Sequence, residues 1–195
     1  MKIILIGNYP LDYQESMQRF SVMLSKGFEA QGLETEIWKP VVFFGKRFSI
    51  TNAGLGKWFG YLDKYLLFPI ILKLRSGKKK YRDVAVKFHI CDHSNAPYLS
   101  YLPKYRTGIT CHDVLAIRGS MGFADAYAPA SKTGTILQKW ILKHLSKAKT
   151  LAAVSKFTLN QLNEISIDSN QGKNWVVIPN AFNAPFYPMG VAQST

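Results

Sequence analysis

Short, nearly uninterrupted apolar runs alternate along the chain with longer segments whose apolar residues recur every three or four positions. The first run, Lys2–Ile6, ends at the turn-forming sequence Gly7–Pro10, as a strand buried on both faces does at its carboxyl end. The segment Glu15–Gln31 has helical spacing and is followed by Gly32, a residue favoured just past a helix end. A second run at Leu33–Trp38 completes a βαβ unit, which predicts parallel strands joined by a right-handed crossover.

The same alternation returns after residue 82. Further strands are predicted at Val84–Ile90, Thr107–Thr110, Thr150–Val154 and Trp175–Ile178, and helices at Ala96–Leu102, Thr133–Lys147 and Lys156–Ile165. The pattern predicts one α/β domain over 1–195, a doubly wound, Rossmann-like parallel sheet with helices on both faces. Ligands of such sheets bind beyond the carboxyl ends of the strands, so the residues directly after each strand are the candidates for a site.

An insertion at about 45–80 interrupts this rhythm and carries most of the charge. The chain has 25 Lys and Arg against 12 Asp and Glu, a net charge of +13. Between Lys39 and Arg82 there are eleven basic residues and one acid, Asp63, so this stretch alone contributes +10. An anionic partner is expected. We do not expect nucleic acid, because no recognised module is present and the aromatic residues alternate with aliphatic ones.

Two interpretations of this insertion remain open, and both include a helix from Lys57 that Pro69 kinks or splits. In the first, the helix belongs to the core and has a solvated polar side, made of Lys57, Gly60, Asp63, Lys64 and Arg75. In the second, it lies in the headgroup region of an anionic bilayer. The membrane-facing residues would then be Trp58, Phe59, Lys78, Lys79 and Lys80.

Several classes of chemistry are excluded by missing motifs. The turn after the first strand has one glycine, Gly7, which argues against an NAD or FAD site, and no Walker loop or nucleophile elbow occurs. Cys91 and Cys111 form no metal-ligand pair and are too few for a disulfide framework, which favours a reducing cytoplasm. We expect no bound metal or cofactor, no signal peptide and no membrane span, and a location in the cytoplasm or at the inner face of the cell membrane.

Polar residues follow two of the predicted strands. Asp92–Asn95 comes directly after Val84–Ile90, where the side chains either face the cleft or cap the next helix. His112 and Asp113 follow the next strand; the imidazole is suited to bind a sugar hydroxyl or stabilise charge, and Asp113 either orients it or caps a helix. His89, inside a strand, is typical of a hydrogen-bonded core histidine.

These segments together resemble the N-terminal domain of retaining GT-B glycosyltransferases of family 4, over nearly the whole chain. The resemblance rests on five segments: Gln14–Met17 with the strand and loop before it, Lys87–His93, Thr107–Asp113, Leu151–Thr158 and Val176–Phe182. Two positions differ from the family: Ala181 replaces a glycine, and Tyr13–Gln14 stands near the place of a Gly-Gly pair that approaches the donor phosphates.

The resemblance implies transfer of a sugar from a nucleotide-sugar to a glycan or lipid-linked acceptor, in polysaccharide biosynthesis and with retention at the anomeric carbon. His112, with Asp113 beside it, would be the catalytic residue near the transferred sugar. The substrate-binding candidates at strand ends are Gly7, Asn8, Tyr13, Gln14, Glu15, Ser16, Asp92, His93, Ser155 and Asn180. In the family the donor-binding domain follows the position of Asn180, so we expect this chain to be the acceptor half and inactive alone. The alternative is a non-catalytic subunit that docks with a separate donor-binding chain.

Overall fold

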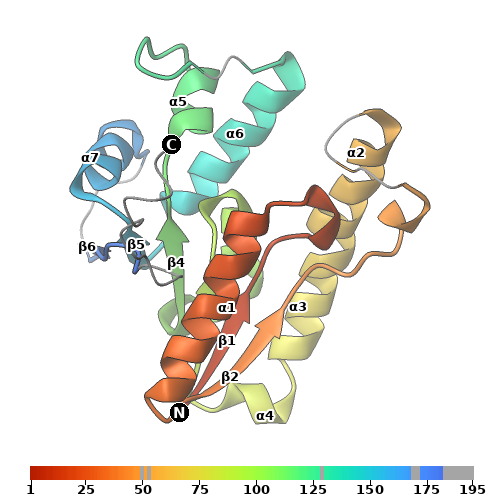
Figure 1. The fold of residues 1–195 in the computed structure, drawn as a ribbon, viewed down its shortest axis with the longest axis vertical. Coiled ribbons are helices and arrows are strands. Elements are labelled where there is room, and N and C mark those ends of the chain that lie inside the picture. The colour runs from red at the N-terminus through yellow and green to blue at the C-terminus, as the bar shows by residue number, and fades with distance from the viewer. Residues whose placement is uncertain (49–50, 52–53, 128–129, 168–171, 182–195) are drawn as a thin grey trace, which may run out of the picture.

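A six-stranded parallel sheet forms the centre of the molecule (Figure 1). The computed structural model describes residues 1–48, 51, 54–127, 130–167 and 172–181. The strand order is β2-β1-β3-β4-β5-β6, and all neighbouring pairs are parallel. The strands are β1 (Lys2–Ile6), β2 (Glu34–Trp38), β3 (Val86–Ile90), β4 (Thr107–Cys111), β5 (Thr150–Ala153) and β6 (Asn174–Val177). The predicted Rossmann-like α/β fold is confirmed.

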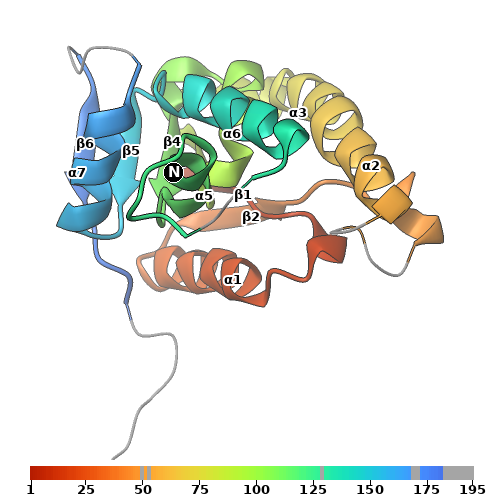
Figure 2. The ribbon, with the colours of Figure 1, turned by 90° about the horizontal axis from the view of Figure 1, so that it is seen from above.

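Helices cover both faces of the sheet, but unequally (Figure 2). Alternate residues of β1 point to different cores: Ile3 and Leu5 belong to a small cluster under α1, whereas Ile4 and Ile6 belong to a large one on the opposite face. The large cluster includes side chains of α3, α5, α6 and α7. The helices are α1 (Glu15–Ala30), α2 (Gly54–Leu62), α3 (Phe68–Ser76), α4 (Lys79–Arg82), α5 (Leu115–Ser120), α6 (Lys132–Leu145) and α7 (Lys156–Ile165).

Helix α1 ends where its sequence predicts. Gly32 has φ +73°, a left-handed conformation that glycine adopts without steric cost. Its N–H donates to the carbonyl of Glu29, and the N–H of Leu33 donates to that of Phe28. These bonds satisfy carbonyls of the last turn and lead the chain directly into β2.

Two predicted elements differ in detail from the structure. The helix predicted at Ala96–Leu102 is a 3₁₀ helix, η4 (His93–Tyr101), and it contains Pro97, which has no N–H to donate to an α-helical bond. Strand β3 begins two residues later than predicted, because Asp83 accepts hydrogen bonds from the N–H groups of residues 85 and 86 and holds that segment in a turn.

The insertion forms one long helical segment interrupted by a π-helical turn. Helix α2 is followed by the turn η3 (Asp63–Leu67) and then by α3, which has Pro69 in its first turn. The segment is not broken at Pro69: it stays helical from Gly54 to Ser76, and the wider π-helical turn directly precedes the proline, which has no N–H to donate. The core-helix interpretation holds in part, because α3 places Phe68 and Leu72 in the core. Its solvated polar side is wrong: Asp63 and Lys64 are buried, whereas Trp58 and Leu66 are each 55% exposed.

Candidate functional site

The carboxyl ends of β1 and β3 meet at the position where the connections of the sheet change direction. From β1 the chain crosses to β2 on one side, whereas β3 pairs with β1 on the other side and leads on to β4. Such a switch point leaves a crevice for ligands in open parallel sheets. The loop after β1 and the segment after β3 therefore adjoin there, as the sequence predicts.

Asn8 links these two segments through its side-chain amide. Its Nδ2 donates to Gln14 Oε1 and to Asp92 Oδ2, both at 2.5 Å, and its Oδ1 accepts from Asn95 Nδ2 at 2.8 Å. Asn8, Asp92 and Asn95 are all buried. A fully bonded buried amide fixes the positions of its partners, so this network holds the floor of the crevice in one arrangement.

Asp92 caps η4, one of the two roles predicted for it, and its carboxylate is buried against Asn8. Its Oδ1 accepts from the backbone N–H of Ser94 at 3.0 Å. Burial acts to raise the pKa of Asp92, but nearby His93 and the hydrogen bonds from Asn8 and Ser94 outweigh it and hold the pKa below its ordinary value. His93 Nδ1 lies 3.3 Å from Asp92 Oδ1 and, among the described residues, makes no hydrogen bond.

A polar pocket of about 130 Å³ opens beside the network, and the insertion supplies one of its walls. Lys64 and Asp12 form an ion pair there at 2.7 Å, with side chains only 10% and 16% exposed. The Lys64 ammonium also lies 5.0 Å from the ring centre of Tyr61 and 5.8 Å from that of Tyr65. The pocket is lined by Asn8, Tyr9, Asp12, Gln14, Tyr61, Lys64, Tyr65, Ser94, Asn95, Leu137, Gln138 and Ile141.

Asp63 fixes the insertion to the rest of the domain. Its carboxylate is fully buried and accepts hydrogen bonds from Tyr9 Oη at 2.7 Å and from the backbone N–H groups of residues 43, 44 and 45. Burial and this bond to Asp63 raise the pKa of Tyr9. Thr51 adds a second attachment by donating to the carbonyl of Leu11. The sequence analysis did not identify Tyr9, Asp12, Asp63 and Lys64 as a group. The feature that could have indicated it is Asp63, the single acid among the eleven basic residues from Lys39 to Arg82.

His112 is oriented by a backbone carbonyl. Its Nε2 donates to the carbonyl oxygen of Cys91 at 2.9 Å, which assigns the proton to Nε2 in the neutral ring and leaves Nδ1 as the acceptor. Phe20 packs edge-on against the imidazole, with 4.6 Å between ring centres. Asp113 is exposed and accepts from the N–H of Leu115, the first residue of α5, at 3.0 Å. Asp113 thus binds the start of this helix from the position before its N-cap, Val114, and the carbonyl of Cys91 orients His112.

The other predicted residues lie around this centre at different distances from the pocket. Ser155 caps α7 by accepting from the N–H of Thr158, whose hydroxyl donates to the carbonyl of His112. Glu15 and Ser16 are exposed at the start of α1 and do not line the pocket. Tyr13 is 60% exposed and has φ +51°, while Gly7 is buried and its N–H donates to the carbonyl of Trp38.

Asn180 lies apart from the switch point, beside a second cavity. This cavity, of about 340 Å³, lies between α1 and the sheet and is lined mainly by apolar side chains, with His89 and Asn180 among them. His89 hydrogen-bonds Thr110, as predicted for a core histidine, through Nε2 at 2.8 Å. Burial, with a smaller contribution from His112, lowers the pKa of His89 to about 4, so its ring is neutral at pH 7. The last segment of the resemblance ends at Phe182, which lies outside the described residues.

No metal or thiol chemistry is evident in the part of the chain that the structure describes. It contains no group of three or more His, Cys, Asp and Glu side chains that could hold a metal ion. Both cysteines are free and buried, and burial raises the pKa of Cys91 to about 12, which makes its thiolate inaccessible near neutral pH. In comparisons with known proteins, no family model, no curated protein and no solved structure matches this chain.

Proposed function

We propose that this domain is the acceptor-binding half of a retaining GT-B glycosyltransferase, acting with a donor-binding half that holds a nucleotide-sugar. The observation that carries the proposal is the polar pocket at the switch point. Amide, carboxylate and ammonium groups of Gln14, Asp12 and Lys64 converge there beside the rings of Tyr61 and Tyr65. This combination suits saccharides, because hydroxyl groups both donate and accept hydrogen bonds and the C–H faces of a sugar pack on aromatic rings.

His112 supports the proposal through its position and its tautomer. It follows β4, next to the strand that supplies Asp92, and its Nε2 is engaged by Cys91. The lone pair of Nδ1 is then suited to accept a hydrogen bond from a hydroxyl of the transferred sugar. In this scheme the residue positions the donor sugar, and the leaving diphosphate assists attack from the same face. With the donor-binding half supplied, His112→Ala is expected to reduce kcat about hundredfold without changing the KM for the acceptor.

Calorimetry with the isolated chain tests which half this is. We expect no binding of UDP-glucose or GDP-mannose, and weak binding of saccharides from a glycoside panel. Gln14→Ala removes a side chain that lines the pocket and is expected to weaken saccharide binding about fivefold, the value of one hydrogen bond. Glu15→Ala is the matched control, since its neighbouring side chain is exposed and does not line the pocket.

Two results would contradict the proposal. Tight binding of a nucleotide-sugar by this chain alone would mean that the acceptor-side assignment is wrong. Saccharide binding that persists without any sugar transfer, after a donor-binding chain is added, would favour the alternative of a non-catalytic binding subunit.

A further inference from the structure

The helical segment α2–η3–α3 exposes large apolar residues along one side, although α3 also buries Phe68 and Leu72 in the core. Gly56, Gly60, Asp63 and Lys64 are buried against the domain. On the other side, large apolar residues spaced three or four positions apart are 37% to 72% exposed. These residues, here called the apolar stripe, are Leu55, Trp58, Phe59, Leu62, Leu66, Ile70 and Leu74.

The apolar stripe extends along the whole segment and is widened by the loop before it. Gly54 to Ser76 is 23 residues by numbering, so the stripe is about 34 Å long at the rise of an α-helix. Phe43 and Phe44, tied to Asp63 by their N–H groups, are also exposed. Contiguous exposed apolar surface of this extent marks an interaction surface.

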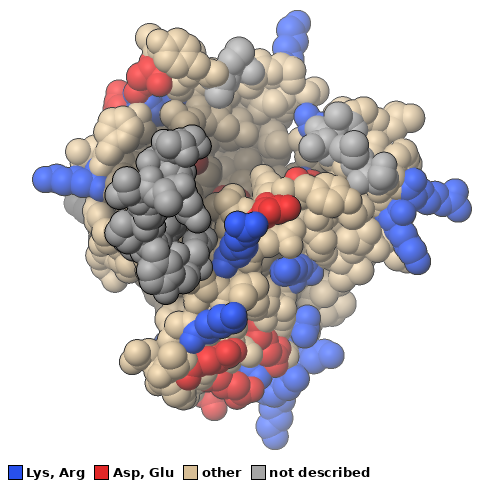
Figure 3. Space-filling view, viewed as in Figure 1, with Lys and Arg blue, Asp and Glu red and all other residues tan. Residues whose placement is uncertain are grey.

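The charges around the stripe identify what it contacts. Of the twelve charged residues from Lys39 to Arg82, the one acid, Asp63, is buried. Lys46 and Arg47 are exposed near one end of the stripe, and Lys78, Lys79 and Lys80 are exposed beyond the other. Over α2 and the preceding loop, the charged side chains that project at the edge of the molecule are Lys and Arg (Figure 3).

We propose that the apolar stripe lies flat in the headgroup region of an anionic bilayer, with the basic residues at both ends contacting lipid phosphates. Apolar area and electrostatic attraction add in this mode of binding. A second copy of the chain is disfavoured as the occupant, because two segments of +10 would face each other. No helix in the described part of the chain is long and apolar enough to cross a membrane.

Vesicle sedimentation with the whole chain tests this inference. We expect binding to equimolar phosphatidylcholine and phosphatidylglycerol, at least about tenfold weaker binding to phosphatidylcholine alone, and release at high salt. On binding, the fluorescence of Trp58, which is 55% exposed, should shift to shorter wavelength. The shift should disappear in Trp58→Phe while the other three tryptophans remain.

Two pairs of variants separate the apolar contribution to vesicle binding from the electrostatic contribution. Leu66→Glu with Ile70→Glu should weaken vesicle binding about tenfold or more. Ile136→Glu with Phe157→Glu, on α6 and α7, should not, although these two side chains are more exposed than Leu66 and Ile70. Replacing Lys78, Lys79 and Lys80 by Gln should weaken it about tenfold. Replacing the exposed lysines 26, 147 and 156 by Gln changes net charge equally and should have little effect.

Several outcomes would overturn the inference. It fails if the chain binds neither vesicle, if both pairs of variants behave alike, or if binding is the same with and without phosphatidylglycerol. A wild-type dimer in sedimentation equilibrium that Leu66→Glu converts to monomer, with no vesicle binding, would assign the stripe to a second copy. Because the assay contains no sugar, its result is independent of the glycosyl-transfer proposal.

Discussion

Helix α1 and the segment α2–η3 each have one side of large apolar residues and one side of polar or small residues, yet they turn these sides in opposite directions. In α1, Phe20, Leu24 and Phe28 pack onto Ile3 and Leu5 of the sheet, and the charged residues face solvent. In the segment that begins with α2, the buried side carries a carboxylate and an ammonium group, and the exposed side carries the apolar stripe. The difference teaches that amphipathic spacing defines two sides of a helix, while the partners available to its polar groups decide which side is buried.

The most severe test of this comparison is Asp63→Ala. It leaves Tyr9 and three backbone N–H groups buried without their acceptor, and we expect it to lower the free energy of unfolding by about 4 kcal/mol. Urea denaturation measures this, with Glu15→Ala as an exposed control. A loss below about 1 kcal/mol would show that the polar side does not hold the insertion in place.

A pair of substitutions within α3 tests its orientation directly. Leu72 is fully buried, so Leu72→Ala should lower the free energy of unfolding by about 3 kcal/mol. Ile70, two positions earlier, is 51% exposed, and Ile70→Ala should cost about 0.5 kcal/mol. Equal losses for the two variants, in the same denaturation experiment, would contradict the outward-facing stripe.

Helix α1 offers a milder case of a buried polar group. Ser25 Oγ hydrogen-bonds Thr35 Oγ1 at 2.6 Å and Glu29 Oε1 at 3.1 Å, and Ser25 is 9% exposed. Ser25→Ala should lower the free energy of unfolding by about 1 kcal/mol, because Thr35 retains its bond to Glu29. Thermal melts are sufficient to detect this change, and a loss as large as that of Asp63→Ala would remove the distinction between the two helices.

The smallest expected effect concerns Glu36 of β2, which accepts a hydrogen bond from Tyr81 just after the insertion. Burial would raise the pKa of Glu36, but bonds from Lys2, Trp38 and Tyr81 lower it to about 2. A carboxylate with a depressed pKa stabilises the fold above its unfolded pKa of 4.5, and this contribution is lost as pH falls toward 2. Glu36→Gln should therefore cost about 0.5 kcal/mol at pH 7 and nothing at pH 2, as measured by denaturation at several pH values.

Much of the fold could be predicted because its determinants are local. The apolar run Lys2–Ile6 and the glycine at position 32 determine a buried strand and a helix end without reference to distant residues. The rule that parallel strands share one carboxyl edge also predicts that Asn8 and Asp92 come together. The pairing of Asp12 with Lys64 could not be predicted, because it depends on where the insertion packs.

The hydrogen-bond partners of the polar side chains at strand ends were harder to predict from the sequence. The sequence is compatible with a bond from Asp113 either to His112 or to a helix N-terminus, and the structure shows that Asp113 accepts from the backbone N–H of Leu115. The π-helical turn before Pro69 has more residues per turn than an α-helix, so it rotates the side chains of α2 relative to those of α3. A single helical period therefore does not describe the whole segment. The resemblance to glycosyltransferases stays a prediction, as do the roles of the residues inferred from it.

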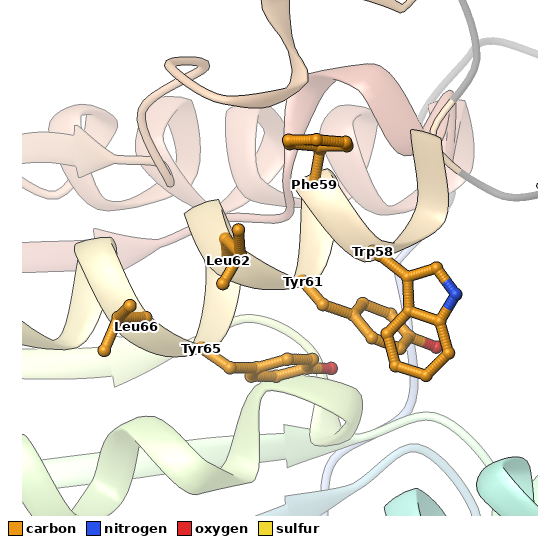
Figure 4. A pocket seen from close by; sticks show the side chains of 6 residues that line it. All are labelled: Trp58, Phe59, Tyr61, Leu62, Tyr65 and Leu66. Atoms are coloured by element: carbon orange, nitrogen blue, oxygen red, sulfur yellow. The ribbon is translucent and has the colours of Figure 1, made fainter. Parts of the chain in front are cut away.

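Tyr61 and Tyr65 line the polar pocket on one side and, on the other, an apolar cleft of about 520 Å³ (Figure 4). Their ring centres are 5.5 Å apart, and the cleft is completed by Trp58, Phe59, Leu62 and Leu66 of the apolar stripe. The two compartments therefore share one wall, and under the two proposals above an acceptor with a polar head and a hydrocarbon chain would contact both sides of it. A domain held at a lipid surface would meet such a ligand within the membrane. Its binding would then depend on the mole fraction of the ligand among the lipids, which does not change when the solution is diluted.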